Sequence, residues 1–359
     1  MSSLEIGIVG LPNVGKSTLF NALTDSNVLA ANYPFATIEP NIGIVPVPDE
    51  RLNKLAELYK TEKIVPATIQ FVDIAGLVSG ASKGEGLGNK FLSHIRSCSA
   101  IIEVVRAFSD SNVTHVDNDH NPAKDIDVIN TELILADLQT VEKRLPRLEK
   151  ETKSNPKLKP LLDNLVAAHR SLDDGKPLWS TPEIDTAGLQ DLMLITAKPI
   201  IYVFNVDDVT LGDEDAKEKL RQLVNPADSL FICAKLEDEL KSLDGYDRIE
   251  LLESYGQDES GLTQLIKAAY HSLGLQSYLT AGEQEVRAWT IPKSATAPQA
   301  AGVIHGDFER GFIAAQIVNY HDLIEAGSEP AARSAGKIRT EGKDYIMQPD
   351  DVVEFRFNV

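Results

Sequence analysis

The eight residues from 10 to 17 constrain what this chain can fold into more than any other feature. They read Gly-Leu-Pro-Asn-Val-Gly-Lys-Ser and fit the pattern G-x-x-x-x-G-K-[ST]. An apolar run at residues 6–9 predicts a buried strand before them, and residues 18–23 are typical of the start of a helix. In this strand-loop-helix context, backbone N–H groups and a helix N-terminus face an anion. The sequence therefore predicts a P-loop domain that binds a nucleotide.

Each position at the end of this loop has an expected partner on the nucleotide. Lys16 reaches the β- and γ-phosphates as a point charge, and the Ser17 hydroxyl is a ligand for Mg²⁺. The residues expected to cradle the phosphates are Asn13, Val14, Gly15, Lys16, Ser17 and Thr18.

Two further segments supply candidate contacts to Mg²⁺ and to the γ-phosphate. Thr37 lies in a proline-containing loop, where nucleotide switches place a second Mg²⁺ ligand. Asp73 ends a predicted buried strand at residues 67–73 and begins a D-x-x-G pattern, so we expect it to hold Mg²⁺ through water. The N–H of Gly76 is then expected to contact the γ-phosphate. Leu77 follows, where many switch GTPases carry a glutamine that orients water, so hydrolysis must be slow or use another polar group.

The base side of the site is expected after a later strand, at residues 199–205. Guanine-binding proteins carry N-K-x-D at this place, and the carboxylate reads guanine while the lysine stem covers the base. This chain has Asn205, Val206 and Asp208 at the three defined positions, so the lysine is replaced by valine. We expect Asn205 and Val206 to frame the base, and the choice between adenine and guanine stays open.

The middle of the chain predicts an inserted helical hairpin. Apolar residues recur at alternating spacings of four and three from Ile134 to Leu148, as in a coiled coil. Pro146 is expected to end or kink this helix, residues 150–156 to form a turn, and residues 157–171 to form the second helix. The hairpin gathers basic residues, either as a solvated helix face or as a surface for RNA. These residues are Lys143, Arg144, Arg147, Lys150, Lys153, Lys157 and Lys159.

The overall composition limits the environment and the partners. The net charge of −19 gives no global attraction to nucleic acid or to an anionic membrane. The two cysteines form no C-x-x-C pair, and no apolar run approaches the length of a membrane span. No secretory signal precedes the first predicted strand, so a cytoplasmic protein is expected.

With these motifs together, the whole chain resembles the YchF / Obg-like ATPase family. The resemblance rests on the P-loop, residues 32–41, residues 73–76 with Leu77, the inserted hairpin and the altered N-K-x-D. The last part of the chain is similar to a TGS domain. The segments that carry that similarity are residues 302–312, 341–346 and 355–359.

The resemblance implies an α/β fold: a G-domain-like P-loop NTPase with a mainly parallel sheet, an inserted α-helical coiled-coil hairpin and a C-terminal β-grasp (TGS) domain. The expected nucleotide domain is discontinuous, at residues 1–122 and 196–274. The helical domain is expected at residues 123–195 and the TGS domain at residues 275–359.

The resemblance also implies an activity and partners. Family members bind and slowly hydrolyse ATP in preference to GTP, with Mg²⁺, and act as conformational switches in translation or the stress response. The expected partner is the ribosome through its large subunit, with rRNA or tRNA contact through the hairpin and the TGS domain. A family histidine assigned to water activation matches His115, which would act with Lys16 in catalysis. From the residues alone, His115 is a solvated loop histidine, and His305 is expected to be structural or to contact a partner.

One position departs from the family and keeps rival functions open. Members usually carry Glu where this chain has Asp208, and the shorter acid would permit GTP binding. The alternatives are therefore a GTP-specific or dual-specificity switch, and a non-catalytic ribosome- or RNA-binding module with a structural nucleotide. A small-molecule phosphotransferase would need an acceptor pocket and a lid, which nothing in the sequence marks.

Overall fold

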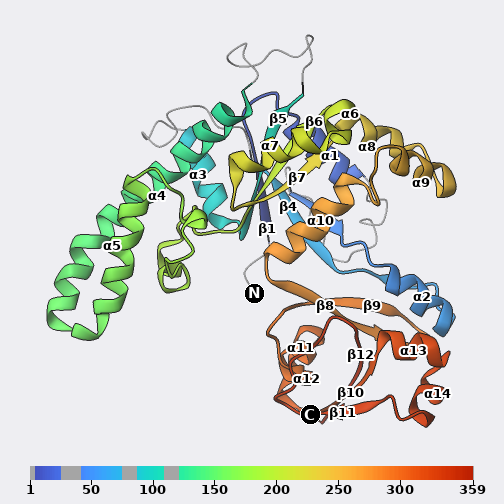
Figure 1. Ribbon diagram of the computed structural model, residues 1–359. Helices are drawn as coiled ribbons and strands as arrows, with labels where there is room; N and C mark the ends of the chain where they lie inside the picture. Colours follow the sequence, from blue (N-terminus) through green and yellow to red (C-terminus); the bar gives the residue numbers. More distant parts are fainter. Residues whose placement is uncertain (1–4, 26–41, 75–86, 109–120, 359) are drawn as a thin grey trace. The chain divides into compact units, whose positions relative to one another are not determined.

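The computed structural model describes residues 5–25, 42–74, 87–108 and 121–358. The chain forms two compact units, each built from two stretches of sequence (Figure 1). The first unit contains Met1–Val45 and Gln70–Leu265, and the second contains Pro46–Ile69 and Ile266–Val359. No helix in the described ranges combines the length and the apolar character that a bilayer crossing requires.

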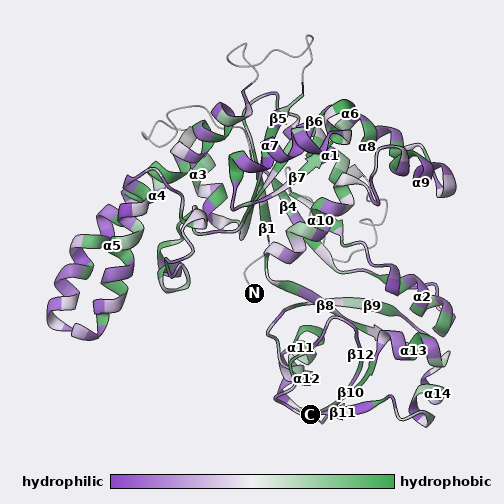
Figure 2. Ribbon diagram, in the orientation of Figure 1, coloured by the Kyte–Doolittle hydropathy of each residue, from purple (hydrophilic) through white to green (hydrophobic). Residues whose placement is uncertain are grey.

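The first unit is organised on a six-stranded sheet with the order β2-β4-β1-β5-β6-β7. Four neighbouring pairs, β4 with β1, β1 with β5, β5 with β6 and β6 with β7, are parallel. Its strands are hydrophobic along most of their length, as expected for a parallel sheet covered on both faces (Figure 2). The strands are β1 (Glu5–Val9), β2 (Ile42–Pro46), β4 (Thr68–Asp73), β5 (Ala100–Ala107), β6 (Ile200–Val206) and β7 (Asp228–Ile232). This is the α/β fold that the P-loop pattern predicts.

Helices follow most of these strands and position the site. The helix α1 starts directly at the P-loop lysine, and α6 and α8 begin directly after β6 and β7. The carboxyl ends of the parallel strands therefore lie next to helix N-termini. The helices are α1 (Lys16–Asp25), α3 (Leu87–Ser97), α6 (Asp208–Gly212), α7 (Glu214–Val224), α8 (Ala234–Lys241), α9 (Gly245–Ser254) and α10 (Gly261–Ser272).

The predicted helical hairpin is present, but its first helix is longer than expected. The helix α4 runs without interruption from Pro122 to Ser154, so Pro146 does not end it and the turn starts later than residue 150. A short 3-10 turn at Pro156–Leu158 leads into α5 (Lys159–Asp173). Packing of the apolar stripe outweighs the hydrogen bond that proline removes. The stripe and its partners on α5 are buried, and they include Ile134, Val141, Leu148, Leu165, Ala168 and Leu172.

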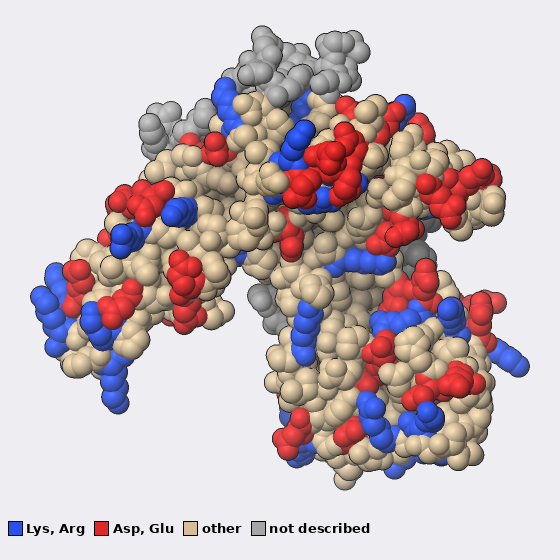
Figure 3. Space-filling model, in the orientation of Figure 1, with Lys and Arg blue, Asp and Glu red and all other residues tan. Residues whose placement is uncertain are grey.

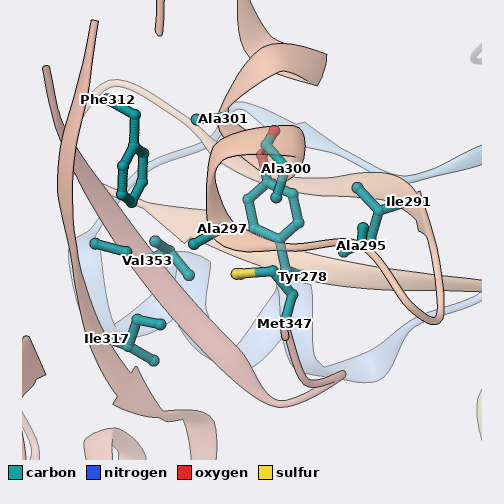
Figure 4. Close-up of a cluster of buried hydrophobic side chains, with 11 residues drawn as sticks. Tyr278, Ile291, Ala295, Ala297, Ala300, Ala301, Phe312, Ile317, Met347 and Val353 are labelled. Atoms are coloured by element: carbon teal, nitrogen blue, oxygen red, sulfur yellow. Dashed lines mark hydrogen bonds between the residues drawn. The ribbon is translucent and has the colours of Figure 1, made fainter. Parts of the chain in front are cut away.

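The second unit has a six-stranded mixed sheet with the order β11-β10-β12-β8-β9-β3. The strands are β3 (Ile64–Val65), β8 (Leu275–Ala281), β9 (Val286–Pro292), β10 (Phe312–Asn319), β11 (Arg339–Glu341) and β12 (Asp351–Phe357). The helices are α2 (Glu50–Tyr59), α11 (Ala297–Ile304), α12 (Gly306–Arg310), α13 (Tyr320–Ala326) and α14 (Glu329–Ser334). Figure 4 shows the core between this sheet and α11, where Tyr278 lies among Ala300, Met347 and Val353. The Tyr278 hydroxyl donates to the carbonyl of Ala300 over 3.0 Å, as a buried tyrosine requires.

The second unit includes a segment that the predicted boundaries placed in the nucleotide domain. Residues 46–69 carry α2 and β3, and β3 pairs in parallel with β9, opposite Val286 and Arg287. The buried residues of α2 are Leu52, Leu55 and Ala56, and α2 contacts β8, β9 and α13. The division found in the structure therefore differs from the predicted one, because this segment finds its apolar partners far away in the sequence.

Candidate functional site

The P-loop leads from β1 into α1 with a backbone that requires glycine at residue 15. Gly15 has φ +95° and Asn13 has φ +64°, so both lie in the left-handed region. A Cβ atom on Gly15 would lie 2.4 Å from the Nδ2 atom of Asn205. The carbonyl of Gly15 accepts the N–H of Leu19 over 2.9 Å, which starts the helix. The loop is therefore shaped by both its own dihedral angles and a side chain from β6.

Asn205 holds the P-loop in place from the end of β6. Its Nδ2 donates to the carbonyl oxygen of Val14 over 3.0 Å, and the residue is 8% exposed. The sequence predicted Asn205 as a residue that frames the base. The structure shows its amide bonded to the loop itself, which ties the loop to β6, the strand that carries the positions predicted to frame the base.

Lys16 and Asp73 form an ion pair inside the site. The ammonium of Lys16 donates to Oδ1 of Asp73, and the two side chains are only 10% and 17% exposed. Asp73 is the last residue of β4 and lies opposite Ile8 in the register with β1, just before the loop. The sheet therefore brings the two residues together, although they are far apart in the sequence.

Ser17 and Thr18 lie on the first turn of α1, and both are exposed. Their backbone N–H groups belong to the positive end of the helix, which favours an anion. The Ser17 hydroxyl and the Asp73 carboxylate are hard oxygen donors of the kind that Mg²⁺ prefers. Among the described residues, no group of three or more His, Cys, Asp or Glu side chains is placed to hold a metal ion.

The positions expected to read the base have different environments. Val206 is 2% exposed, so its side chain is buried in the core of the first unit. Asp208 is the first residue of α6, and its Oδ1 accepts the N–H of Val209 over 3.1 Å. Asp207, which the sequence did not single out, caps α6 by accepting the N–H of Thr210 over 2.8 Å. An aspartate directly before a short helix is the signal that could have identified this cap.

A cavity of about 470 Å³ adjoins the P-loop on the side of β6 and β7. The loop contributes Gly15, and α1 contributes Thr18 to its wall. Ala234 and Lys235, the first residues of α8, line it as well. The remaining lining residues are Leu19, Asn21, Ala22, Val104, Val203, Asn205, Ile232, Glu237, Asp238, Lys241 and Leu262.

Glu237 is a buried carboxylate in this wall that sequence reasoning missed. It is 5% exposed, and its Oε1 accepts the N–H of Gly261 over 2.7 Å at the start of α10. Burial raises its pKa, and the hydrogen bonds from the backbone of Gly261 and Leu262 oppose that rise. Glu237 thus joins α8 to α10, and no local pattern announces such a contact because the two residues lie in different helices.

Three predicted site residues, Thr37, Gly76 and His115, lie outside the described residues, and so does Leu77. Their roles therefore stay predictions. His305, expected to be structural or to contact a partner, has an N-terminal capping contact: its Nδ1 accepts the N–H of Asp307 over 3.2 Å.

Two family models match the chain. One, described as "50S ribosome-binding GTPase", matches residues 5–137. The other, named YchF-GTPase_C and described as a protein of unknown function, matches residues 275–358. The first model covers the P-loop and Asp73, and the second covers nearly all of the C-terminal part of the second unit.

Three relatives that match along nearly the whole chain are YchF proteins. The Ribosome-binding ATPase YchF of Bacillus subtilis is 52% identical over 99% of this chain and 100% of its own length. The protein of the same name from Escherichia coli O157:H7 is 49% identical, with 99% of each chain covered. A solved structure of the YchF GTPase of Schizosaccharomyces pombe superimposes with a TM-score of 0.86 at 39% identity, covering 99% of this chain and 98% of that one. The similarity therefore includes both units.

Proposed function

Because the chain belongs to the YchF family of P-loop NTPases, we propose that it is a ribosome-binding ATPase. It binds and slowly hydrolyses ATP with Mg²⁺ and uses the nucleotide as a switch in translation or the stress response. Ribosome binding implies work in the cytoplasm. The relatives that carry the name Ribosome-binding ATPase align over their whole lengths, so the chain has a counterpart for every part of them.

The observation that carries the proposal is the Lys16–Asp73 ion pair beside the P-loop. A buried ammonium with one carboxylate partner is ready to exchange that partner for phosphate oxygens, which present more negative charge. The N-terminus of α1 and the left-handed geometry of Gly15 direct backbone N–H groups to the same place. These groups bind and orient a triphosphate, which is most of what phosphoryl transfer asks of a protein.

Ser17, Thr37 and Asp73 are the residues that would hold Mg²⁺. The metal would neutralise charge that develops on the phosphates. The chain's own groups do the rest: Lys16 binds the β- and γ-phosphates, and the N–H of Gly76 contacts the γ-phosphate. His115 would position the attacking water, since Leu77 has no polar group.

The base specificity depends on the end of β6. Val206 supplies no lysine stem to cover a base, which removes one feature of guanine binding. Asp208 keeps a carboxylate in the position that reads guanine, but it already accepts the N–H of Val209. The bacterial relatives are named ATPases and the fission yeast relative is named a GTPase, so a direct comparison of nucleotides is needed. We place ATP first and GTP second.

The helical hairpin is the proposed contact for ribosomal RNA or tRNA, on the large subunit and together with the TGS domain. Figure 3 shows Lys and Arg gathered at the end of the hairpin, although the chain as a whole is acidic. Arg144 pairs with Glu151, and Lys159 pairs with Asp163. In the described part of the chain no ion pair involves Lys150, Lys153 or Lys157. These three free cations support binding to a phosphate backbone.

Replacing Lys16 by alanine tests the proposal. We expect Lys16→Ala to lose ATP binding while the full chain stays folded, because the P-loop backbone does not depend on the ammonium. Titration with labelled ATP and Mg²⁺, turnover with and without ribosomes, and co-sedimentation with ribosomes are the readouts. Normal ATP affinity in the variant would refute the P-loop assignment. Binding without turnover, even with ribosomes, would favour the non-catalytic module.

A further inference from the structure

One loop of the nucleotide-binding unit is built into the other unit. The strand β2 ends at Pro46 and β4 begins at Thr68, and the two are neighbours in the first unit's sheet. Residues 47–67, which we call the interstrand segment, carry α2 and β3 and belong to the second unit. The N–H of Val47 donates to the carbonyl of Ala67 over 2.8 Å. This hydrogen bond joins the two ends of the interstrand segment, next to the end of β2 and the start of β4.

Charged side chains attach the interstrand segment to the turn that precedes β12. The Nη1 of Arg51 donates to Oδ1 of Asp350 over 2.9 Å and to the carbonyl of Pro349 over 2.6 Å. Its Nε and Nη2 bind the two carboxylate oxygens of Asp49 over 2.8 and 2.7 Å. Bidentate arginine–carboxylate pairs are among the stronger and more directional polar contacts. We call Arg51, Asp49 and Asp350 the Arg51 clasp.

Apolar and backbone contacts complete this attachment. Leu55 of α2 is fully buried, and Leu52 is 2% exposed. The strand β3 pairs with β9, with Ile64 opposite Val286, and the N–H of Val286 donates to the carbonyl of Lys63 over 2.9 Å. These contacts are spread over the whole segment and make it part of the second unit.

The other end of the same stretch reaches the phosphate site. The strand β4 starts directly after the interstrand segment and ends at Asp73, the partner of Lys16. It is a continuous strand of 6 residues that crosses the boundary between the units at Ile69 and Gln70. The strand β4 therefore links Asp73, within one continuous element, to residues that belong to the second unit.

We propose that the interstrand segment is a conformational relay that couples nucleotide occupancy at the P-loop to the C-terminal unit. The inference rests on the proposed function, since phosphate must draw Lys16 away from Asp73 and free that carboxylate to shift. The shift reaches α2 and β3 through β4, and the Arg51 clasp passes it to β12. Because linkage is reciprocal, a partner that binds the C-terminal unit changes nucleotide affinity by the same factor.

Hydrogen exchange of the full chain, with and without a non-hydrolysable ATP analogue and Mg²⁺, tests the relay. In the unmodified protein we expect the analogue to change exchange in the interstrand segment, β9 and β12. In Arg51→Ala we expect the analogue still to bind, because Arg51 makes no contact with the P-loop in the described residues, together with loss of the response in β9 and β12. Asp350→Asn is a milder second variant that weakens the same clasp.

Arg339→Ala is the matched control. Arg339 donates over 2.9 Å to Asp351, which follows Asp350 and is the first residue of β12. In the described contacts Arg339 touches no residue of the interstrand segment. It should keep the full response. The relay is refuted if the unmodified protein binds the analogue without any change in the second unit, or if Arg51→Ala and Asp350→Asn respond normally. Failure of the unmodified protein to bind the analogue would instead refute the proposed function.

Discussion

The side-chain amide of Asn205 donates a hydrogen bond to the carbonyl oxygen of Val14 over 3.0 Å. This contact joins the end of β6 to the P-loop across 191 residues of sequence. The loop is therefore held by a side chain from β6, the strand that also carries the positions predicted to frame the base. Under the proposed function, phosphate binding and base selection share this structural support.

Removing this support should weaken nucleotide binding without removing any phosphate contact. Asn205→Ala leaves the buried carbonyl of Val14 without its donor, which costs about 1–3 kcal/mol, and we expect about tenfold weaker ATP binding. Isothermal titration with ATP and Mg²⁺ measures this. Asn164→Ala is a matched control, since Asn164 makes a similar side-chain contact to the backbone of Asp185 in the helical hairpin. It should lose stability and keep its affinity, and equal affinities in the two variants would contradict the support role.

Gly15 should tolerate no side chain. In Gly15→Ala the new Cβ would be 2.4 Å from Asn205 Nδ2, and φ +95° adds strain of about 1–3 kcal/mol. We expect no measurable ATP binding by equilibrium titration. Gly175 has φ +74°, and no atom lies within 4 Å of the place its Cβ would take, so Gly175→Ala should cost about 1 kcal/mol and bind normally. Retained ATP binding in Gly15→Ala would show that the loop can adopt another shape.

Glu103 should make the first unit less stable as the pH rises. This residue of β5 is fully buried, and neither carboxylate oxygen has a hydrogen-bond partner among the described residues. Burial raises its pKa well above 4.5, with a smaller contribution from Asp125. The folded state therefore holds a proton that the unfolded state releases above pH 4.5. Stability from this group is full below that pH and falls by up to about 1.4 kcal/mol per pH unit until the folded pKa is reached.

Glu103→Gln removes this titration and keeps the shape of the side chain. The difference in the free energy of unfolding between Glu103→Gln and the unmodified protein should grow in favour of the variant from pH 5 upward. Denaturant titrations across the pH range measure it. A difference that stays constant with pH would show that Glu103 is ionised in the folded protein.

Local signals in the sequence predicted the strand-loop-helix of the P-loop and the helical hairpin, whereas long-range contacts could not be predicted. The P-loop, the strand that delivers Asp73 and the helical hairpin are encoded by contiguous patterns, so each could be identified. The hydrogen bond from Asn205 to Val14 could not be predicted, because the end of β6 and the P-loop are far apart in the sequence. The attachment of β3 to β9 pairs Ile64 with Val286, and no periodicity reveals that pairing. Pro146 predicts the end of a helix because proline has no backbone N–H to donate. The helix continues past it because the apolar stripe around Leu148 is buried.

The most direct test of the central claim is the equilibrium affinity of the purified full chain for ATP and for GTP, each with Mg²⁺. The same titrations on Asp208→Glu show whether that carboxylate selects the base. We expect ATP to bind at least about tenfold tighter than GTP, a difference of about 1.4 kcal/mol, and the substitution to change little. GTP binding that equals or exceeds ATP binding, and that weakens in Asp208→Glu, would contradict it and identify a guanine-specific or dual switch.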